Sequence, residues 1–162
     1  MPNLLIRYMI FFCIFFSFSL TAKGDCFDNA GHYYRIDPDY LRAIAWQESR
    51  FKVNAINKNY DGSLDVGIMQ INTKTLNSIK KEYPTLTKER LLNEPCLNIF
   101  VGSMLLKRNF DMYGRKWISV GMYNAGMRNK DHIIKNRYNY ASKIFSHYND
   151  IKDGIIKRIE IN

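Results

Sequence analysis

Apolar residues recur at helical spacing along most of the chain, and the clearest case begins at Asp37-Pro38. Asp is a common N-cap, and Pro fits the first position of a helix. Leu41, Ile44 and Glu48 then fall at positions i, i+3 and i+7 of one face. The pattern predicts a helix from residue 38 to about 49, with a carboxylate on its apolar side near the C-terminal end.

The rest of the pattern predicts more helices and one hairpin. The segment 54–72 is rich in turn residues, and Asp61-Gly62 within it favours a hairpin between short strands. Residues 127–136 indicate a basic loop, and the chain from Asp150 is expected to fray. The pattern therefore predicts a single α+β domain, predominantly α, with one small β-hairpin. The further helices are expected at 26–34, 73–83, 88–92, 95–113, 117–123 and 138–148.

The first 24 residues have the pattern of a secretory signal peptide. Arg7 precedes the short apolar run 8–20, and small residues follow at Ala22 and Gly24. We expect cleavage after Gly24, a domain at 25–150 and a C-terminal tail at 151–162. The alternative is an uncleaved N-terminal anchor, but the run is shorter than the roughly 18 residues of a membrane span.

Composition and charge narrow the class of protein. The chain has 162 residues, of which 46% are hydrophobic and 24% charged, as in a globular domain. Its net charge is +9, and loss of residues 1–24 removes Arg7 and Lys23, which leaves +7. A basic, aromatic-rich domain suits nucleic acid, an anionic membrane surface or an acidic polysaccharide. Export argues against nucleic acid, whereas peptidoglycan offers carboxylates on its stem peptides and apolar sugar faces.

The cysteines agree with export. Cys13 leaves with the signal peptide, so Cys26 and Cys96 remain as an even pair in an oxidising compartment. We predict a disulfide between them. The few cysteines and histidines lack the local spacing of metal ligands, so no metal site is expected.

Two carboxylates are candidates for chemistry. Glu48 lies on an apolar helix face, where burial would raise its pKa and suit it to general acid catalysis. The alternative without a catalytic role is a helix-terminal Glu that reaches solvent. Asp65 follows seventeen residues later on the expected hairpin, and a helix carboxylate and a hairpin carboxylate can flank a glycosidic bond. Asp is also common near turns, so the pair alone is weak.

Three short motifs resemble the signatures of lytic transglycosylases with the lysozyme-like fold, in the same order and spacing. They are Glu48-Ser49, Gly-Ile-Met-Gln at 67–70 and Met-Tyr-Asn-Ala-Gly at 122–126. The resemblance extends from about Cys26 to Tyr148. It is greatest to the small exported members that accompany type III secretion, conjugation and type IV pilus systems. One departure is Met122, where the family more often has Ala, and many large members lack a carboxylate at Asp65.

The resemblance implies a site and a reaction. Glu48 would protonate the oxygen between N-acetylmuramic acid and N-acetylglucosamine, and would then deprotonate the muramoyl 6-hydroxyl, giving a 1,6-anhydro product. Apart from the resemblance, the developing positive charge needs electrostatic support, either from Asp65 or from substrate and backbone groups. No cofactor or metal is implied, since the nucleophile belongs to the substrate. The implied substrate-contact set is Ser49, Met69, Gln70, Tyr123, Asn124 and Tyr140.

The expected partners are peptidoglycan strands and a component of a type III secretion, conjugation or pilus apparatus. We expect a periplasmic location, no nucleic acid and no stable membrane span after signal cleavage. Two alternatives stay open. One is a hydrolysing, lysozyme-type muramidase that uses Glu48 and Asp65, and the other is a non-catalytic peptidoglycan-binding subunit of an assembly.

Overall fold

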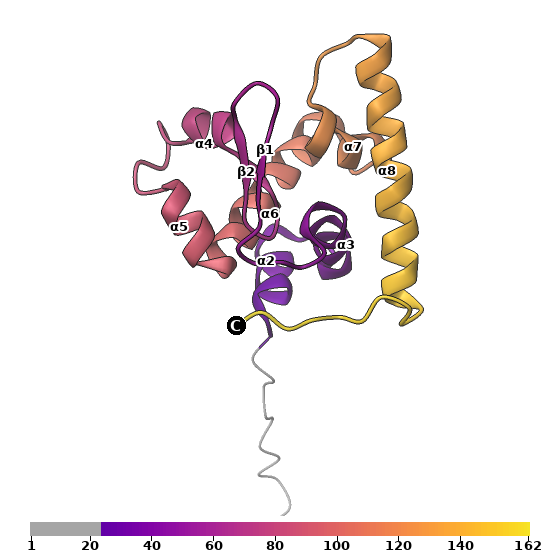
Figure 1. The fold of residues 1–162 in the computed structure, drawn as a ribbon. Coiled ribbons are helices and arrows are strands. Elements are labelled where there is room, and N and C mark those ends of the chain that lie inside the picture. Colours follow the sequence, from indigo (N-terminus) through magenta and orange to yellow (C-terminus); the bar gives the residue numbers. More distant parts are fainter. Residues whose placement is uncertain (1–23) are drawn as a thin grey trace, which may run out of the picture.

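The computed structural model describes residues 24–162, so the predicted signal peptide, apart from Gly24, lies outside the described residues. Figure 1 shows helices gathered around a short hairpin, with α8 along one side. Within the described part, no helix is long and apolar enough to cross a bilayer. The helices are α2 (Cys26–Tyr34), α3 (Pro38–Ser49), α4 (Thr73–Ile79), α5 (Lys88–Asn93), α6 (Pro95–Tyr113), α7 (Trp117–Ala125) and α8 (Asp131–Lys152). The strands are β1 (Ile56–Lys58), β2 (Leu64–Val66) and β3 (Ile71–Asn72).

Helix α3 has the predicted start and end. The Asp37 side chain caps it, and Arg50, in the left-handed conformation at φ 53°, ends it. Leu41 and Ile44 are fully buried. The apolar face of α3 therefore points into the core and brings Glu48, one turn further along, to the edge of that core.

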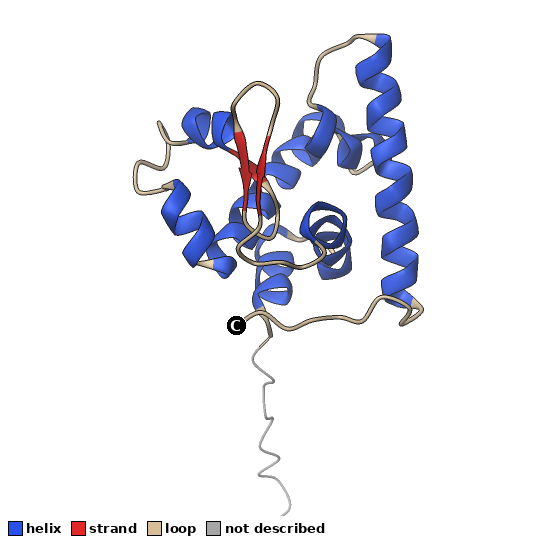
Figure 2. Ribbon diagram, in the orientation of Figure 1, coloured by secondary structure: helices blue, strands red, loops and turns tan. Residues whose placement is uncertain are grey.

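The predicted hairpin is present, and a third strand extends it into an antiparallel sheet of order β1-β2-β3. Asp65, in the central strand, pairs with Asn57 on β1 and with Asn72 on β3. Strand β3 has two residues, which is too short for alternation to reveal it. Figure 2 shows the strands in red among the blue helices.

The core lies where the longer helices meet. Helix α8 packs against α7 and α3, and α6 packs against α2 and α7. The predicted Cys26–Cys96 disulfide is present and joins α2 to the start of α6. The fully buried side chains include Phe27, Leu41, Ile44, Met69, Leu106 and Ile144.

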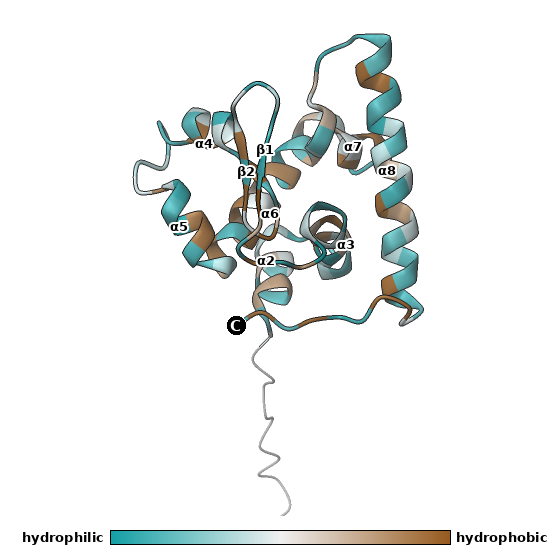
Figure 3. Ribbon diagram, viewed as in Figure 1, coloured by the Kyte–Doolittle hydropathy of each residue, from teal (hydrophilic) through white to brown (hydrophobic). Residues whose placement is uncertain are grey.

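The largest differences from the predicted helix boundaries are in α4 and α8, and α8 also ends at Lys152 rather than at 148. Helix α4 ends at Ile79 rather than at 83. Helix α8 begins at Asp131, so the expected basic loop 127–136 is half helical. Figure 3 shows hydrophilic and hydrophobic residues alternating along α8, as in a helix with one buried face. Helix α8 carries many charged and polar residues, most of which face solvent. In the sequence these residues obscure the spacing of the few buried positions.

The chain after α8 packs against the domain and is not frayed, so that expectation was wrong. Ile156 is buried, and Arg158 donates to both carboxylate oxygens of Asp39 at 2.8 and 3.0 Å. The backbone N–H of Cys26 donates to the carbonyl of Ile161 at 2.7 Å. These partners are far away in sequence, so the local pattern could not reveal them.

Candidate active site

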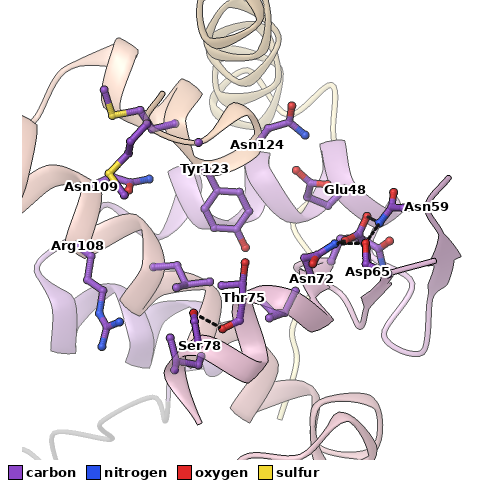
Figure 4. Close-up of a pocket in the computed structure, with 18 of the residues that line it drawn as sticks. Glu48, Asn59, Asp65, Asn72, Thr75, Ser78, Arg108, Asn109, Tyr123 and Asn124 are labelled. Carbon is purple, nitrogen blue, oxygen red and sulfur yellow. Dashed lines mark hydrogen bonds between the residues drawn. The ribbon is translucent and has the colours of Figure 1, made fainter. Parts of the chain in front are cut away.

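A groove of about 1220 Å³ lies between the sheet, α4, the C-terminal half of α6 and the end of α7. Pockets of roughly 300–1000 Å³ hold drug-sized ligands, so the groove has room for an extended ligand. Figure 4 shows side chains from these elements facing the groove. Five of the predicted site residues line it: Glu48, Asp65, Gln70, Tyr123 and Asn124.

Glu48 combines burial with a hydrogen bond from a buried tyrosine. The hydroxyl of Tyr140, a side chain only 6% exposed, donates to Glu48 Oε1 at 2.5 Å. Burial raises the pKa of Glu48 to about 7; the bond from Tyr140 opposes this rise and the charge of Asp65 adds to it. The predicted rise of the pKa is confirmed. Near neutral pH, Glu48 is populated in both protonation states, as a group that gives and retakes a proton requires.

The end of α3 holds Glu48 in place. Arg50 and Phe51, which follow, both adopt the left-handed conformation, so the chain turns sharply away from the helix. The Ser49 hydroxyl donates to the carbonyl of Ile68 at 2.8 Å. Ser49 is buried and does not line the groove. It connects α3 to the segment 67–70.

Asp65 lies between two asparagine side chains. Asn59 Nδ2 donates to one of its carboxylate oxygens at 2.9 Å, and Asn72 Nδ2 donates to the other at 2.7 Å. Asn72 is its pairing partner on β3. Figure 4 shows Asp65 and Glu48 at the same end of the groove. A separation of their carboxyl groups below about 10 Å, the upper end for glycosidase pairs, stays a prediction.

The segment 67–70 is a tight turn held from several sides. Gly67 has φ +77°, and a Cβ there would lie 2.0 Å from the Asn98 side chain. Asn98 Oδ1 accepts from the backbone N–H of Met69 at 2.8 Å. The carbonyl of Met69 accepts from the Tyr123 hydroxyl at 2.9 Å. The turn therefore connects the sheet to α6 and α7.

The predicted contact residues fall into two groups. Tyr123 and the exposed Asn124 face the groove, and burial raises the pKa of Tyr123 well above its usual range, so its hydroxyl stays neutral. Ser49, Met69 and Tyr140 are buried and do not line the groove. These three side chains support the groove walls, and Tyr140 acts on Glu48.

Gln70 belongs to both groups. It lines the groove, yet its Oε1 accepts from Asn57 at 2.7 Å and its Nε2 donates to the carbonyl of Gly67 at 2.8 Å. It adopts the left-handed conformation at φ 49°. These bonds use the side-chain amide to hold the turn in that strained shape.

Sequence reasoning missed the asparagines that orient the site. Asn98 is fully buried, and its Nδ2 donates to the carbonyls of Val66 and Leu91. A buried-face asparagine in an apolar helix was a usable signal for it. Asn59 and Asn72 carried no comparable signal, because their contact with Asp65 depends on strand register.

The site offers no cluster that would hold a metal. Between residues 24 and 162, no group of three or more His, Cys, Asp or Glu side chains is arranged to bind an ion. The two groove carboxylates have different neighbours, one a buried tyrosine and the other two amides. This difference between the surroundings of the two carboxylates suits one proton-transferring group and one fixed negative charge.

Several known proteins resemble this chain. The X polypeptide of Escherichia coli (strain K12) is 38% identical over 148 residues, which cover 91% of this chain and 86% of the relative. Invasion protein IagB of Salmonella typhi is 40% identical over 133 residues, 82% of this chain and 81% of the relative. Protein IpgF of Shigella flexneri is 41% identical over 127 residues, with shares of 78% and 81%.

A solved structure supports the fold. An inactive mutant of lytic transglycosylase Slt from Pseudomonas aeruginosa superimposes with a TM-score of 0.60 at 16% identity. The match covers 80% of this chain and 23% of that longer chain. The sequence model of the transglycosylase SLT domain matches residues 25–146, which include Glu48, the turn at 67–70 and Tyr123. The chain therefore belongs to the transglycosylase SLT domain family and is a lytic transglycosylase built on the lysozyme-like fold.

Proposed function

We propose that the protein cleaves the β-1,4 bond between N-acetylmuramic acid and N-acetylglucosamine in peptidoglycan and releases a 1,6-anhydromuramoyl product. The observation that carries the proposal is Glu48, a groove residue whose pKa is raised to about 7. A group with that pKa can donate and accept a proton near neutral pH.

The reaction proceeds in two proton transfers. Protonated Glu48 gives its proton to the bridging oxygen, and the C1–O bond breaks with its electron pair going to that oxygen. Glu48, now a carboxylate, takes the proton of the muramoyl 6-hydroxyl while the 6-oxygen bonds to C1. Glu48 is protonated again at the end, and no water is consumed. Proximity of the 6-hydroxyl takes the place of a bound nucleophile.

The neighbouring residues have separate roles in this proposal. Tyr140 positions the Glu48 carboxyl through its hydroxyl. Tyr123, fixed by its bond to Met69, presents its ring to the groove beside the exposed Asn124. We assign Tyr123 and Asn124 to sugar contacts.

Asp65 supplies a fixed negative charge. Its two oxygens accept from Asn59 and Asn72, which hold the carboxylate in one orientation at the groove wall. There it would stabilise the oxocarbenium-like transition state. The same carboxylate is the observation that favours a second candidate, a hydrolysing muramidase in which Glu48 and Asp65 act with water.

We also propose that the protein acts in the periplasm and opens the wall locally for a secretion, conjugation or pilus machine. The signal-like sequence at 1–24, the Cys26–Cys96 disulfide and the similarity to an invasion protein support this context. Cell fractionation tests the location. Complementation of a deletion strain by the wild type, but not by Glu48→Gln, tests the requirement for wall cleavage.

The experiment that tests the enzyme itself compares wild type with Glu48→Gln on purified peptidoglycan. We expect lysis by the wild type, loss of lysis in the variant and retained binding of glycan strands by both. Equal lysis by both proteins would contradict the assigned role of Glu48. Binding without lysis by the wild type would instead favour the non-catalytic subunit.

A further inference from the structure

Ser63, directly before β2, lies at the centre of a hydrogen-bond network to which the proposed reaction assigns no role. Its side chain is 7% exposed, and its hydroxyl oxygen accepts from Asn59 Nδ2 at 3.2 Å and from Asn72 Nδ2 at 3.0 Å. The same two amide nitrogens donate to Asp65, one to each carboxylate oxygen. Figure 4 shows both asparagines beside Asp65. Ser63 therefore contacts both side chains that hold this carboxylate.

The proton of the Ser63 hydroxyl points away from the asparagines. It is donated to Asp61 Oδ1 at 2.7 Å, and the backbone N–H of Ser63 donates to the same oxygen at 3.0 Å. The other carboxylate oxygen of Asp61 accepts from Lys74 Nζ at 2.5 Å. The bonds from Lys74 and Ser63 hold the pKa of the Asp61 carboxyl well below its usual range. Asp61 therefore stays ionised near neutral pH and continues to accept the proton of Ser63.

The donors and acceptors of this network match one to one. A hydroxyl group has one proton to donate and two lone pairs that accept. Because the proton of Ser63 goes to Asp61, its lone pairs remain for the two amide nitrogens. Each amide nitrogen has two protons. In both asparagines one of these protons goes to Ser63 and the other goes to Asp65.

Ser63 matters most for the orientation of Asn59. The other asparagine is also held by its carbonyl, because Asn72 Oδ1 accepts from the backbone N–H of Lys74 and caps α4. For the Asn59 side chain, Ser63 and Asp65 are the two hydrogen-bond partners within the described range 24–162. If the Asn59 amide turned over, its carbonyl oxygen would face the Asp65 carboxylate, and two acceptors would meet without a proton between them.

We propose that Ser63 is a positioning residue for Asp65, because its hydroxyl keeps the N–H groups of the two asparagines, rather than their carbonyl oxygens, turned toward the carboxylate. This inference rests on the proposed function, in which Asp65 stabilises the positive charge of the transition state. Such stabilisation is effective when the charge is fixed in place before the reaction. Ser63 supplies part of that fixation through the asparagines, since its hydroxyl proton and both lone pairs are used inside the protein.

The test measures kcat and KM on soluble glycan strands for four proteins: the wild type, Ser63→Ala, Asp65→Asn and the double variant. Ser63→Ala should lower kcat about tenfold with little change of KM, which is the size of effect expected when one hydrogen bond to a charged group is lost. In the Asp65→Asn background, the same change should alter kcat by less than about twofold, because the charge that Ser63 positions is already absent.

Ser78→Ala is the matched control. Ser78 also lines the groove, but its hydroxyl donates to the carbonyl of Thr75 on its own helix at 2.7 Å. Its kcat should equal that of the wild type, and an equal fall in Ser78→Ala and Ser63→Ala would overturn the proposal. If Ser63→Ala does not fold, Asn59→Ala replaces it, because this change removes the oriented amide at a half-buried position and should show the same dependence on Asp65.

Two further results would overturn the positioning role. The first is an unchanged kcat in Ser63→Ala. The second is a tenfold fall in both the wild-type and the Asp65→Asn backgrounds, which would show that Ser63 supports the fold rather than the charge of Asp65. Either result leaves the proposed function intact, because lysis by the wild type depends on Glu48. Failure of the wild type to cleave the strands would overturn the proposed function itself.

Discussion

Removal of one hydroxyl should move the pH dependence of the enzyme. Tyr140 donates to Glu48 Oε1 at 2.5 Å from a buried position, and this bond lowers the pKa that burial raises. Tyr140→Phe removes the bond, so the pKa of Glu48 should rise above about 7. A hydrogen bond to a charged group is worth about 1.5–3 kcal/mol, and about 1.4 kcal/mol corresponds to one pKa unit. The shift should therefore be about one to two pH units.

The direction of the shift in the pH profile follows from the first step of the reaction. The free enzyme needs protonated Glu48, so kcat/KM should fall as pH rises through the pKa of Glu48. In Tyr140→Phe, Glu48 stays protonated to higher pH, and the alkaline limb of the profile should move upward. The assay is release of soluble muropeptides from purified peptidoglycan between pH 5 and 9.5, in roughly half-unit steps around the expected limb.

Tyr138→Phe serves as the control, because Tyr138 lies on the same helix with its side chain 62% exposed. Its profile should match that of the wild type. An alkaline limb that stays in place or moves downward in Tyr140→Phe would refute the link between Tyr140, Glu48 and proton donation.

Three further predictions concern single groups. Glu48→Gln should raise the free energy of unfolding by about 3 kcal/mol at pH 8, because burial disfavours the ionised form of Glu48. The gain should vanish below the ordinary pKa of Glu, and urea melts at a series of pH values measure it. Asp65→Asn should lower kcat by about 10²-fold with little change of melting temperature, and full activity would remove Asp65 from the mechanism. Reduction of Cys26–Cys96, which closes a loop with a sequence separation of 70, should cost about 4 kcal/mol and lower Tm by about 10 °C in calorimetry.

The helices that sequence reasoning predicted well have clear start and stop residues. Asp37-Pro38 and Pro95 open α3 and α6, and Gly114 ends α6 as expected. Helix α8 lacks such signals, since no side chain caps its start. Its buried positions include Arg137, a residue type that hydrophobic patterning counts as surface.

In the site, too, local features could be predicted from the sequence and long-range contacts could not. Glu48 could be predicted because its helix face is defined by neighbours at i−7 and i−4, which is local information. The two asparagines that hold Asp65 could not, because Asn59 and Asn72 reach its carboxylate only when the strands have paired. The tail could not either, since the ion pair of Arg158 with Asp39 spans 119 positions.

The central claim is that Glu48 transfers protons while the substrate supplies its own nucleophile. Mass analysis of muropeptides released by the wild type from purified peptidoglycan tests this most directly, with Glu48→Gln as the blank. The account predicts products that are lighter than hydrolysed muropeptides by one water and that resist borohydride reduction, because a 1,6-anhydro ring has no free reducing end. Products with free reducing ends would show that water attacks C1, and the protein would then be a hydrolysing muramidase.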